Sequence, residues 1–314
     1  MTHLIRSLNQ VPSRARGGVA TMGNFDGVHL GHQALIRAVV EAAKRQGRPS
    51  VVVTFEPHPF EFFSGDKLTI PRITRFREKF RALSALGCDY VLLLKFNQEL
   101  ASISASDFVN QLWVQALAIQ SLIVGDDFHF GRDRAGNIDL LVAEGKAHGF
   151  SAEAMPTFLL NGERVSSTRV RAALVAGDLA GAAALLGRPF TLEGRVRLGA
   201  QLGRQWGFPT ANIYPHRRLT PVKGIFTVKV HGLAQHPLVG VANVGTRPTV
   251  DGTRTLLEVH LHDFNRNIYG HDVIVEFCTK LRDEVRFSNI DALREQIAND
   301  VLASHDYFKR LGLL

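Results

Sequence analysis

The chain has 314 residues and a formal net charge of +8, from 37 Lys and Arg against 29 Asp and Glu. This length favours two domains over one, and an apolar fraction of 45% lets each half bury a core. The positive charge fits an anionic partner such as a nucleotide, but it is too dispersed for a basic nucleic-acid-binding tail. The two cysteines, Cys88 and Cys278, exclude a disulfide framework and a zinc knuckle, and we expect two buried thiols. Without a signal-peptide core or an apolar stretch of membrane length, the sequence predicts a cytoplasmic protein.

The first half alternates strand-like and helix-like segments. Four segments have the pattern of strands: residues 18–23, 50–55, 90–96 and 121–128. Three segments have the period of helices: residues 32–47, 75–87 and 104–118. The last of these is expected to be capped by Ser104 or Ser106. This alternation predicts a parallel sheet with crossover helices. Ligands of such sheets bind beyond the carboxyl ends of the strands. The segments "GNFDG" and "GDDFHFG" follow the first and fourth strands, so both are expected at that edge.

The pattern changes near residues 186–190. Two short helices are expected before this point, one from Ser166 and one capped by Asp178. Beyond it, short β-branched segments separated by Gly, Pro and Asn predict an antiparallel sheet or barrel. A final helix is expected over residues 288–305, capped by Ser288. The sequence therefore predicts an α/β fold with a Rossmann-like domain over residues 1–186 and an antiparallel β-barrel domain with a terminal helix over residues 187–314.

The segment "GVHLGH" joins the first strand to the first helix. A glycine-bearing turn at a helix start directs backbone N–H groups outward, which suits a phosphate. His29 and His32 are three residues apart and can share one side of the opening turn. Three roles stay open from the pattern alone: a metal pair, structural loop histidines, or phosphate contacts. The metal role lacks further ligands of suitable spacing.

Two other segments have the composition of phosphate-binding sites. In "VSSTRVR", Ser167 and Thr168 stand at a helix start with Arg171 one turn on, which fits either a plain helix cap with a solvated arginine or a phosphate clamp. The segment "GRVRLGAQLGRQWGFPTAN" fits either a glycine-rich hairpin or a flap over phosphates. Thr210 and Asn212, two residues apart, could face one side of a strand and offer oxygen atoms to one Mg²⁺.

Four motifs of the first half together resemble the FMN adenylyltransferase module of bacterial bifunctional riboflavin kinase/FAD synthetase, over residues 17–186. They are "GNFDGVHLGHQALI", "VVTFEPHP", "IVGDDFHFGRDRAG" and "SSTRVR". The resemblance implies that His29, His32 and Arg171 are catalytic, with the two histidines at the ATP phosphates. It implies that ATP is bound by Gly23, Asn24, Phe25, Asp26, Gly31, Ser167 and Thr168. It also implies a flavin site formed by Phe55, Pro57, Pro59, Phe62 and Asp127, while His129 receives no role.

The second half resembles the riboflavin kinase module of the same enzymes over residues 187–305, through "GFPTAN", "GVANVGTRPT", "LEVHLHDF" and "KLRDEVRF". The resemblance implies that Thr210 and Asn212 bind Mg²⁺ and ATP, and that Gly199 and Gly203 lie at the ATP phosphates. Glu258 would be the base that deprotonates the riboflavin 5′-hydroxyl, although alone it also fits a solvent-facing strand residue. Arg282 and the final helix would close over the flavin.

The resemblance as a whole implies one polypeptide that phosphorylates riboflavin to FMN and adenylylates FMN to FAD, with Mg²⁺ and ATP. The expected partners are the small molecules ATP, riboflavin and FMN, without nucleic acid or membrane, and a homo-oligomer stays open. Two other functions fit part of the sequence: a nucleic-acid-binding protein with a nucleotidylyltransferase-like fold, and a nucleotidylyltransferase for a pantetheine or nicotinamide acceptor. The attached "GFPTAN" half argues against the second.

Overall fold

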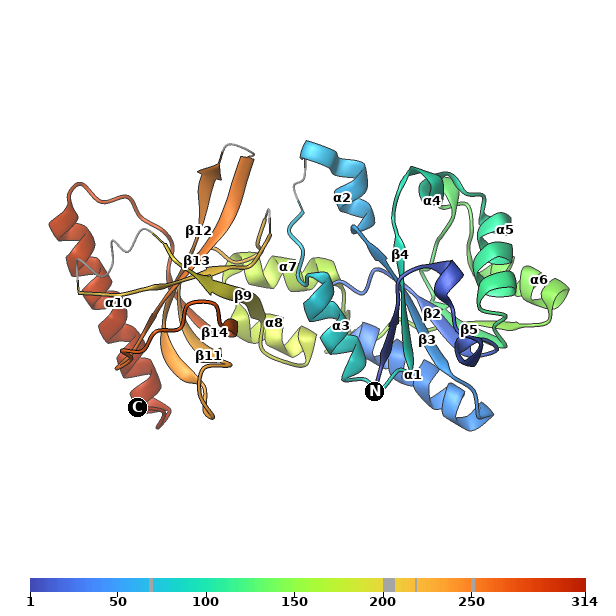
Figure 1. The fold of residues 1–314 in the computed structure, drawn as a ribbon, viewed down its shortest axis with the longest axis horizontal. Coiled ribbons are helices and arrows are strands. Elements are labelled where there is room, and N and C mark those ends of the chain that lie inside the picture. The colour runs from blue at the N-terminus through green and yellow to red at the C-terminus, as the bar shows by residue number, and fades with distance from the viewer. Residues whose placement is uncertain (68–69, 200–206, 218, 250–251) are drawn as a thin grey trace. The chain divides into compact units, whose positions relative to one another are not determined.

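The computed structural model describes residues 1–67, 70–199, 207–217, 219–249 and 252–314. The chain packs as two compact units. Unit 1 consists of Met1–Ile70 and Thr74–Ser166, and unit 2 consists of Pro71–Ile73 and Ser167–Leu314. The fold class predicted from the sequence is confirmed, because unit 1 contains a parallel sheet with helices and unit 2 contains a closed antiparallel barrel (Figure 1).

Unit 1 contains a six-stranded parallel sheet in the order β1-β4-β3-β2-β5-β6. Its strands are β1 (His3–Ile5), β2 (Val19–Met22), β3 (Ser50–Glu56), β4 (Tyr90–Lys95), β5 (Ser121–Gly125) and β6 (Ser151–Met155). The four predicted strands form its centre, and the edge strands β1 and β6 were not predicted. The sequence order reverses between β2 and β5, so the loops after these two strands flank a switch point of the kind that binds ligands.

Helices cover both faces of this sheet. The helices are α1 (Leu30–Gln46), α2 (Pro59–Ser64), α3 (Phe76–Ser84), α4 (Gln98–Ser102), α5 (Ala105–Phe108) and α6 (Ile138–His148), with short 3₁₀ turns at Leu8–Gln10, Ser13–Ala15, Gly65–Lys67 and Arg132–Arg134. The continuous β-branched run of β3 is buried on both faces of the sheet, as a central strand requires. Val52 packs in the cluster with α1, and Val51 and Val53 pack in the cluster on the other face.

The segment predicted as one α-helix over residues 104–118 is a short α-helix followed by a π-helix. Ser104 caps α5 by accepting a hydrogen bond from Asp107 N at 3.1 Å. From Val109 to Ala116 the chain then continues as a π-helix, with Leu117 N donating to Leu112 O at 3.0 Å. The wider turn carries Trp113, which is fully buried, into the core. An apolar stripe alone does not distinguish this turn from a regular α-helix.

A short hairpin ends unit 1. Strands β7 (Leu159–Leu160) and β8 (Glu163–Arg164) are joined by Asn161 and Gly162, whose φ angles are 54° and 79°. Two consecutive positive φ angles in an Asn-Gly turn define the tight hairpin that matches strand twist. The hairpin brings Arg164 back toward the loop after β5.

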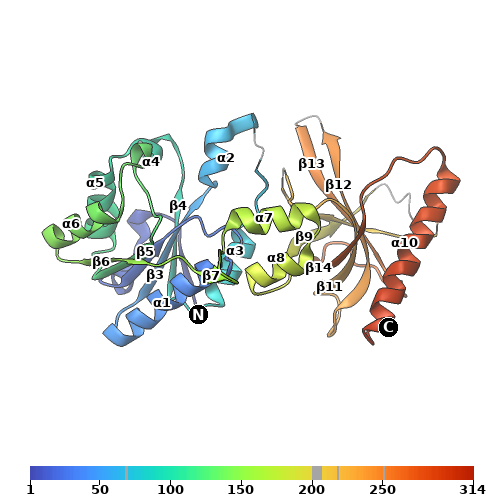
Figure 2. The same ribbon diagram turned by 180° about the vertical axis from the view of Figure 1, so that it is seen from behind.

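Unit 2 begins with α7 (Ser167–Ala176) and α8 (Leu179–Leu186), which lie side by side in both views (Figure 1, Figure 2). Asp178 caps α8 as predicted, accepting from Gly181 N at 2.8 Å. The barrel closes in the order β10-β13-β12-β11-β14-β9. Its strands are β9 (Thr191–Arg197), β10 (Ala211–Tyr214), β11 (Gly224–His231), β12 (Leu238–Thr249), β13 (Gly252–Leu261) and β14 (Asp272–Arg282).

The terminal helix α10 (Ile290–Arg310) packs on the outer face of β11, β12 and β14 (Figure 2). Ser304 fixes this packing, because its hydroxyl donates to Gly240 O at 3.1 Å and contacts His262 Nε2 at 2.9 Å. The predicted cap was wrong by one residue: Asn289, not Ser288, caps α10 by accepting from Ala292 N at 2.8 Å.

The two thiols differ in burial. Cys88 is buried as expected, whereas Cys278 is only half-buried. Burial raises the pKa of each thiol to about 11, so both are protonated at neutral pH. Among the described residues, no helix is long and apolar enough to cross a membrane.

Candidate active sites

The loop between β2 and α1 is held from behind by the segment that precedes α3. Asp26 is 2% exposed, and its Oδ1 accepts hydrogen bonds from Thr74 N at 2.9 Å and Thr74 Oγ1 at 3.1 Å. Gly27 N donates to Thr74 Oγ1 at 2.9 Å. Lys79, fully buried, donates from Nζ to Asn24 O at 2.7 Å. The loop is therefore fixed by partners that the sequence motif does not contain.

Phe25 and Asp26, two of the predicted ATP-binding residues of this loop, are buried in its interior. Phe25 is 1% exposed and packs in the core cluster with α1. A Cβ at Gly23 would lie 3.0 Å from the Phe25 ring, so the small residue leaves room for the ring. The structure thus gives Gly23, Phe25 and Asp26 a role in shaping the loop, and their contact with ATP stays a prediction.

His29 and His32 lie together at the start of α1. Their rings stack with centroids 3.6 Å apart and an interplanar angle of 17°. His29 is the helix cap, and its Nδ1 accepts a hydrogen bond from His32 N at 3.3 Å. An accepting Nδ1 is unprotonated, so the ring proton of His29 is on Nε2. A Cβ at Gly31 would approach the His29 ring to 3.3 Å, so the glycine permits this close packing.

The predicted phosphate clamp lies in unit 2. Ser167 and Thr168 form the first turn of α7, and Arg171 follows on the same helix. Arg171 Nε donates to Pro71 O at 2.9 Å, which ties residues 71–73 to this helix. A joint site of this clamp with His29 and His32 stays a prediction.

Two of the residues predicted to border the flavin, Phe55 and Phe62, pack against Phe96, which the sequence motifs did not single out. Phe55, at the end of β3, packs edge-on against Phe96 with ring centroids 5.8 Å apart. Phe62 on α2 packs against the same ring at 5.4 Å. Pro59 is the first residue of α2, and Pro57 lies just before it. The helix start is fixed by a capping box between His58 and Glu61.

The loop after β5 carries two aspartates with different partners. Asp126 accepts from Thr157 N and Thr157 Oγ1, each at 2.8 Å, and these hydrogen bonds lower its pKa. Asp127, the predicted polar contact of the flavin, pairs with Arg164 of the hairpin. His129 Nδ1 contacts Asp127 O at 3.0 Å. Arg164 was missed because its pairing depends on the Asn-Gly turn.

The second site contains the predicted kinase residues on neighbouring strands of the barrel. Asn212 on β10 pairs in register with Glu258 on β13. Ile213 and Val259, their sequence neighbours, meet inside the barrel. Alternation along a strand therefore places Asn212 and Glu258 on the outer face, with their Cβ atoms about 4.5–5.5 Å apart. The metal ligand and the base expected from the sequence are thus adjacent.

Gly199 lies directly over Asn212. An ideal Cβ at Gly199 would be 2.3 Å from Asn212 Nδ2 and 2.4 Å from Asn212 Cγ. Such distances do not occur between real atoms, so only glycine fits at residue 199 while Asn212 keeps its place. Asn212 is 7% exposed, in keeping with this cover. Gly203, the other glycine predicted at the ATP phosphates, lies outside the described residues.

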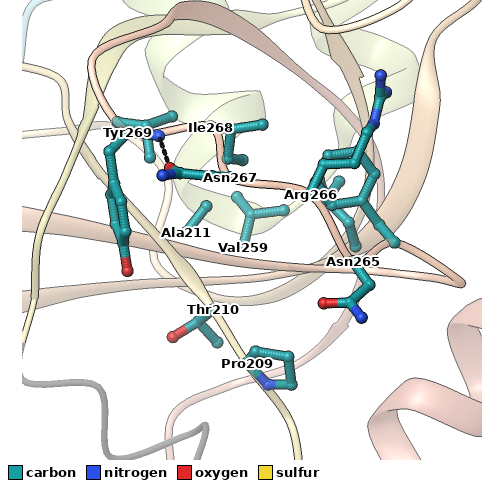
Figure 3. Close-up of a pocket in the computed structure, with 12 residues that line it drawn as sticks. Pro209, Thr210, Ala211, Val259, Asn265, Arg266, Asn267, Ile268 and Tyr269 are labelled. Carbon is teal, nitrogen blue, oxygen red and sulfur yellow. Dashed lines mark hydrogen bonds between the residues drawn. The ribbon is translucent and has the colours of Figure 1, made fainter.

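Thr210 borders a pocket of about 400 Å³ at the barrel. In Figure 3, Pro209 and Thr210 lie on one side of the pocket, Ala211 and Val259 lie in its middle, and residues 265–269 lie around the other sides. Asn267 Oδ1 accepts from Tyr269 N at 3.1 Å, which holds this segment in a turn. The pocket has the size of a small-molecule site and offers both apolar and amide surfaces.

Two further contacts fix the elements around this site. His260, two residues after Glu258 on β13, has Nδ1 2.9 Å from Pro209 O. Because a carbonyl only accepts, Nδ1 carries the proton, and His260 holds the backbone just before Thr210. Arg282 donates to both oxygens of Asp300 on α10, at 2.8 and 2.6 Å. Arg282 therefore joins β14 to the terminal helix, and its predicted contact with the flavin stays a prediction.

The donor set at this site fits Mg²⁺ bound largely through a nucleotide. Among the described residues, no group of three or more His, Cys, Asp or Glu could hold a metal ion. A Thr hydroxyl and an Asn amide are hard oxygen donors, and Mg²⁺ in such sites takes few protein ligands plus phosphate oxygens and water. Thr210 and Asn212 carry donors of this kind, but Thr210 lies just before β10, and a shared metal site of the two residues stays a prediction.

Two protein families match this chain in sequence, one over each half. The sequence model of the FAD synthetase family matches residues 11–169, and that of the riboflavin kinase family matches residues 186–308. The bifunctional riboflavin kinase/FMN adenylyltransferase of Escherichia coli (strain K12) is 46% identical over 97% of this chain and 96% of the relative. The enzyme of the same description from Haemophilus influenzae is 44% identical over 97% of this chain and 99% of the relative.

A solved structure covers nearly the same length. It is described as a macrolide-efflux protein from Streptococcus pneumoniae, is 29% identical, and matches 97% of this chain and 98% of its own with a TM-score of 0.80. From the two matched families and the full-length relatives, the chain belongs to the bifunctional riboflavin kinase/FMN adenylyltransferase family.

Proposed function

We propose that residues 187–314 phosphorylate riboflavin to FMN and that residues 1–186 adenylylate FMN to FAD. The family to which the chain belongs has both activities, and its two modules occur here in the matching order. The observation that supports the residue assignment is the in-register pairing of Asn212, the proposed metal ligand, with Glu258, the proposed base. The riboflavin kinase match from residue 186 supports the boundary.

In the kinase step, the 5′-hydroxyl oxygen of riboflavin forms a bond to the γ-phosphorus of ATP while the bond to the ADP oxygen breaks. Glu258 takes the hydroxyl proton, a role open to a carboxylate within hydrogen-bond reach. Thr210 and Asn212 would hold Mg²⁺, and the ion would supply positive charge at the phosphates. His260 keeps the backbone before Thr210 in place through Pro209 O.

In the adenylyl step, a phosphate oxygen of FMN attacks the α-phosphorus of ATP and pyrophosphate leaves. The nucleophile is already anionic, so the protein's tasks are positioning and charge stabilisation. The Nε2–H of His29 suits donation to a phosphate oxygen, and His32 stacks against it. Ser167, Thr168 and Arg171 hold the pyrophosphate side, and the aromatic group around Phe96 borders the flavin.

The test is the flavin product profile over time. Purified protein incubated with riboflavin, ATP and Mg²⁺ should form FMN first and FAD afterwards, separated by liquid chromatography. Absence of both flavins, together with salt-dependent binding to RNA or DNA, would favour the nucleic-acid-binding alternative. A cytoplasmic location is part of the proposal, supported by the ATP that both steps consume.

A further inference from the structure

Asn243 has a buried polar atom that the protein leaves without a partner. Within the described part of the chain, its Oδ1 is shielded from solvent and makes no hydrogen bond. Most buried side-chain oxygens in folded proteins have a partner, because an unpaired acceptor loses the hydrogen bonds of water without replacement. A buried acceptor without a partner is therefore explained either by a ligand that donates a hydrogen bond to it or by the packing of the side chain.

The place of Asn243 in the barrel points to a ligand. Asn243 on β12 pairs in register with Glu258 on β13 on one side and with Ile225 on β11 on the other. Glu258 also pairs with Asn212, so three polar side chains lie in a row across β10, β13 and β12. Residues paired in register share one face of a sheet. Asn243 is therefore next to the proposed base, on the opposite side from the metal ligand Asn212.

One pleat further along β12, a second carboxylate lies over the same face. An ideal Cβ at Gly245 would be 2.4 Å from Glu284 Oε1, so the Glu284 side chain occupies the space above the glycine. Residues two apart on a strand point the same way, so Asn243 is bordered by Glu258 across the strand and by Glu284 along it. Ionised carboxylates only accept hydrogen bonds. Glu284 Oε2 also pairs with Lys223 Nζ at 3.5 Å. The strip thus presents acceptor atoms of Asn243, Glu258 and Glu284 and suits a ligand with several hydroxyl groups.

We propose that Asn243 binds a secondary hydroxyl of the riboflavin ribityl chain and thereby holds the terminal 5′-hydroxyl within reach of Glu258. The inference rests on the proposed kinase role of Glu258. A hydroxyl serves either orientation of the Asn243 amide, because it can donate to the oxygen and accept from the nitrogen. Asn243 is then a positioning residue for the phosphoryl acceptor, and it takes no part in proton removal.

The experiment compares riboflavin with a flavin whose N10 chain is 5-hydroxypentyl, which keeps the terminal hydroxyl and lacks the secondary ones. Kinase kinetics are measured for the full-length wild type, Asn243→Ala and Asn243→Leu. With riboflavin, kcat/KM should fall about tenfold or more in both variants, tenfold being equivalent to 1.4 kcal/mol. With the hydroxypentyl flavin it should change less than about twofold, since the lost contact is absent there. The KM for ATP should stay at the wild-type value.

Two measurements separate this role from a structural one. Adenylylation of supplied FMN by the same variants reports whether the chain is folded and should be unchanged. Asn243→Leu should be at least as stable to urea as the wild type, because an apolar side chain of similar size removes the orphan acceptor. Asn9→Leu, at an exposed position of unit 1, serves as the matched control and should leave all values unchanged.

Equal losses for the two flavins, wild-type kinetics on riboflavin, or a destabilised Asn243→Leu would each overturn the proposal. The proposed base is tested apart from it by Glu258→Gln. Kinase activity retained in Glu258→Gln would overturn the assignment of the base, whereas the flavin comparison reports on Asn243 in either case.

Discussion

Replacing His29 with asparagine separates the structural role of this side chain from its proposed role at the ATP phosphates. The imidazole caps α1 through Nδ1, at 3.3 Å from His32 N, and this leaves the ring proton on Nε2. Asparagine is a preferred helix cap and can accept the same hydrogen bond. Its short side chain has no group that corresponds to Nε2–H.

The two roles differ in expected magnitude. Because the cap is retained, the free energy of unfolding of His29→Asn should stay within about 0.5 kcal/mol of wild type, whereas His29→Ala should lose roughly 0.5–1 kcal/mol. The rate of FAD formation should fall about 10²–10³-fold in both variants, the range for removing one donor from charge that develops in a transition state. FMN formation from riboflavin should be unaffected in both.

The assay follows FAD formation from supplied FMN, ATP and Mg²⁺, with FMN formation from riboflavin as the internal control. Unfolding in urea gives the stability of each variant. His148→Asn, a substitution of a partly exposed histidine on α6, is the matched control and should behave as wild type. Wild-type FAD formation by His29→Asn would refute the phosphate role and leave His29 as a helix cap alone.

Three further predictions concern unit 2. Glu258→Gln should lower kinase kcat by about 10²–10⁴-fold and leave adenylylation of supplied FMN intact; equal loss of both activities would instead indicate misfolding. Gly199→Ala should raise the KM for Mg-ATP in the kinase assay. The added Cβ would lie 2.3 Å from Asn212 Nδ2, so the Asn212 side chain would have to move. An unchanged KM would show that Asn212 does not bind the nucleotide. Burial, followed by electrostatic repulsion from the neighbouring His260 and His305 side chains, lowers the pKa of His262 from 6.5 to about 4. The unfolded chain therefore takes up a proton between pH 6.5 and 4 that the folded chain does not, and stability falls as pH falls through this window. His262→Gln should flatten that part of a urea-unfolding series, and an unchanged pH profile would contradict the assignment.

The sequence by itself determined the features that depend on neighbouring residues. The β-branched run of β3 requires burial on both faces, and the periodic apolar residues before Gly47 define α1 with its left-handed end. The motifs around His29 and Thr210 were likewise readable, since their residues are contiguous. The change of pattern near residue 186 predicted two domains in this order, whereas the two compact units divide between Ser166 and Ser167.

Tertiary structure alone decided which distant residues meet. The pairing of Asn212 with Glu258 depends on the register and closure of the barrel, and a shift of one residue would turn either side chain to the other face. Thr74 supports Asp26 only because the segment before α3 returns beneath the first loop. Asn243 gave no local signal, because an orphan acceptor exists only once the surrounding strands have shielded it from water. Local patterns fix the elements, and long-range packing fixes which side chains face one another across them.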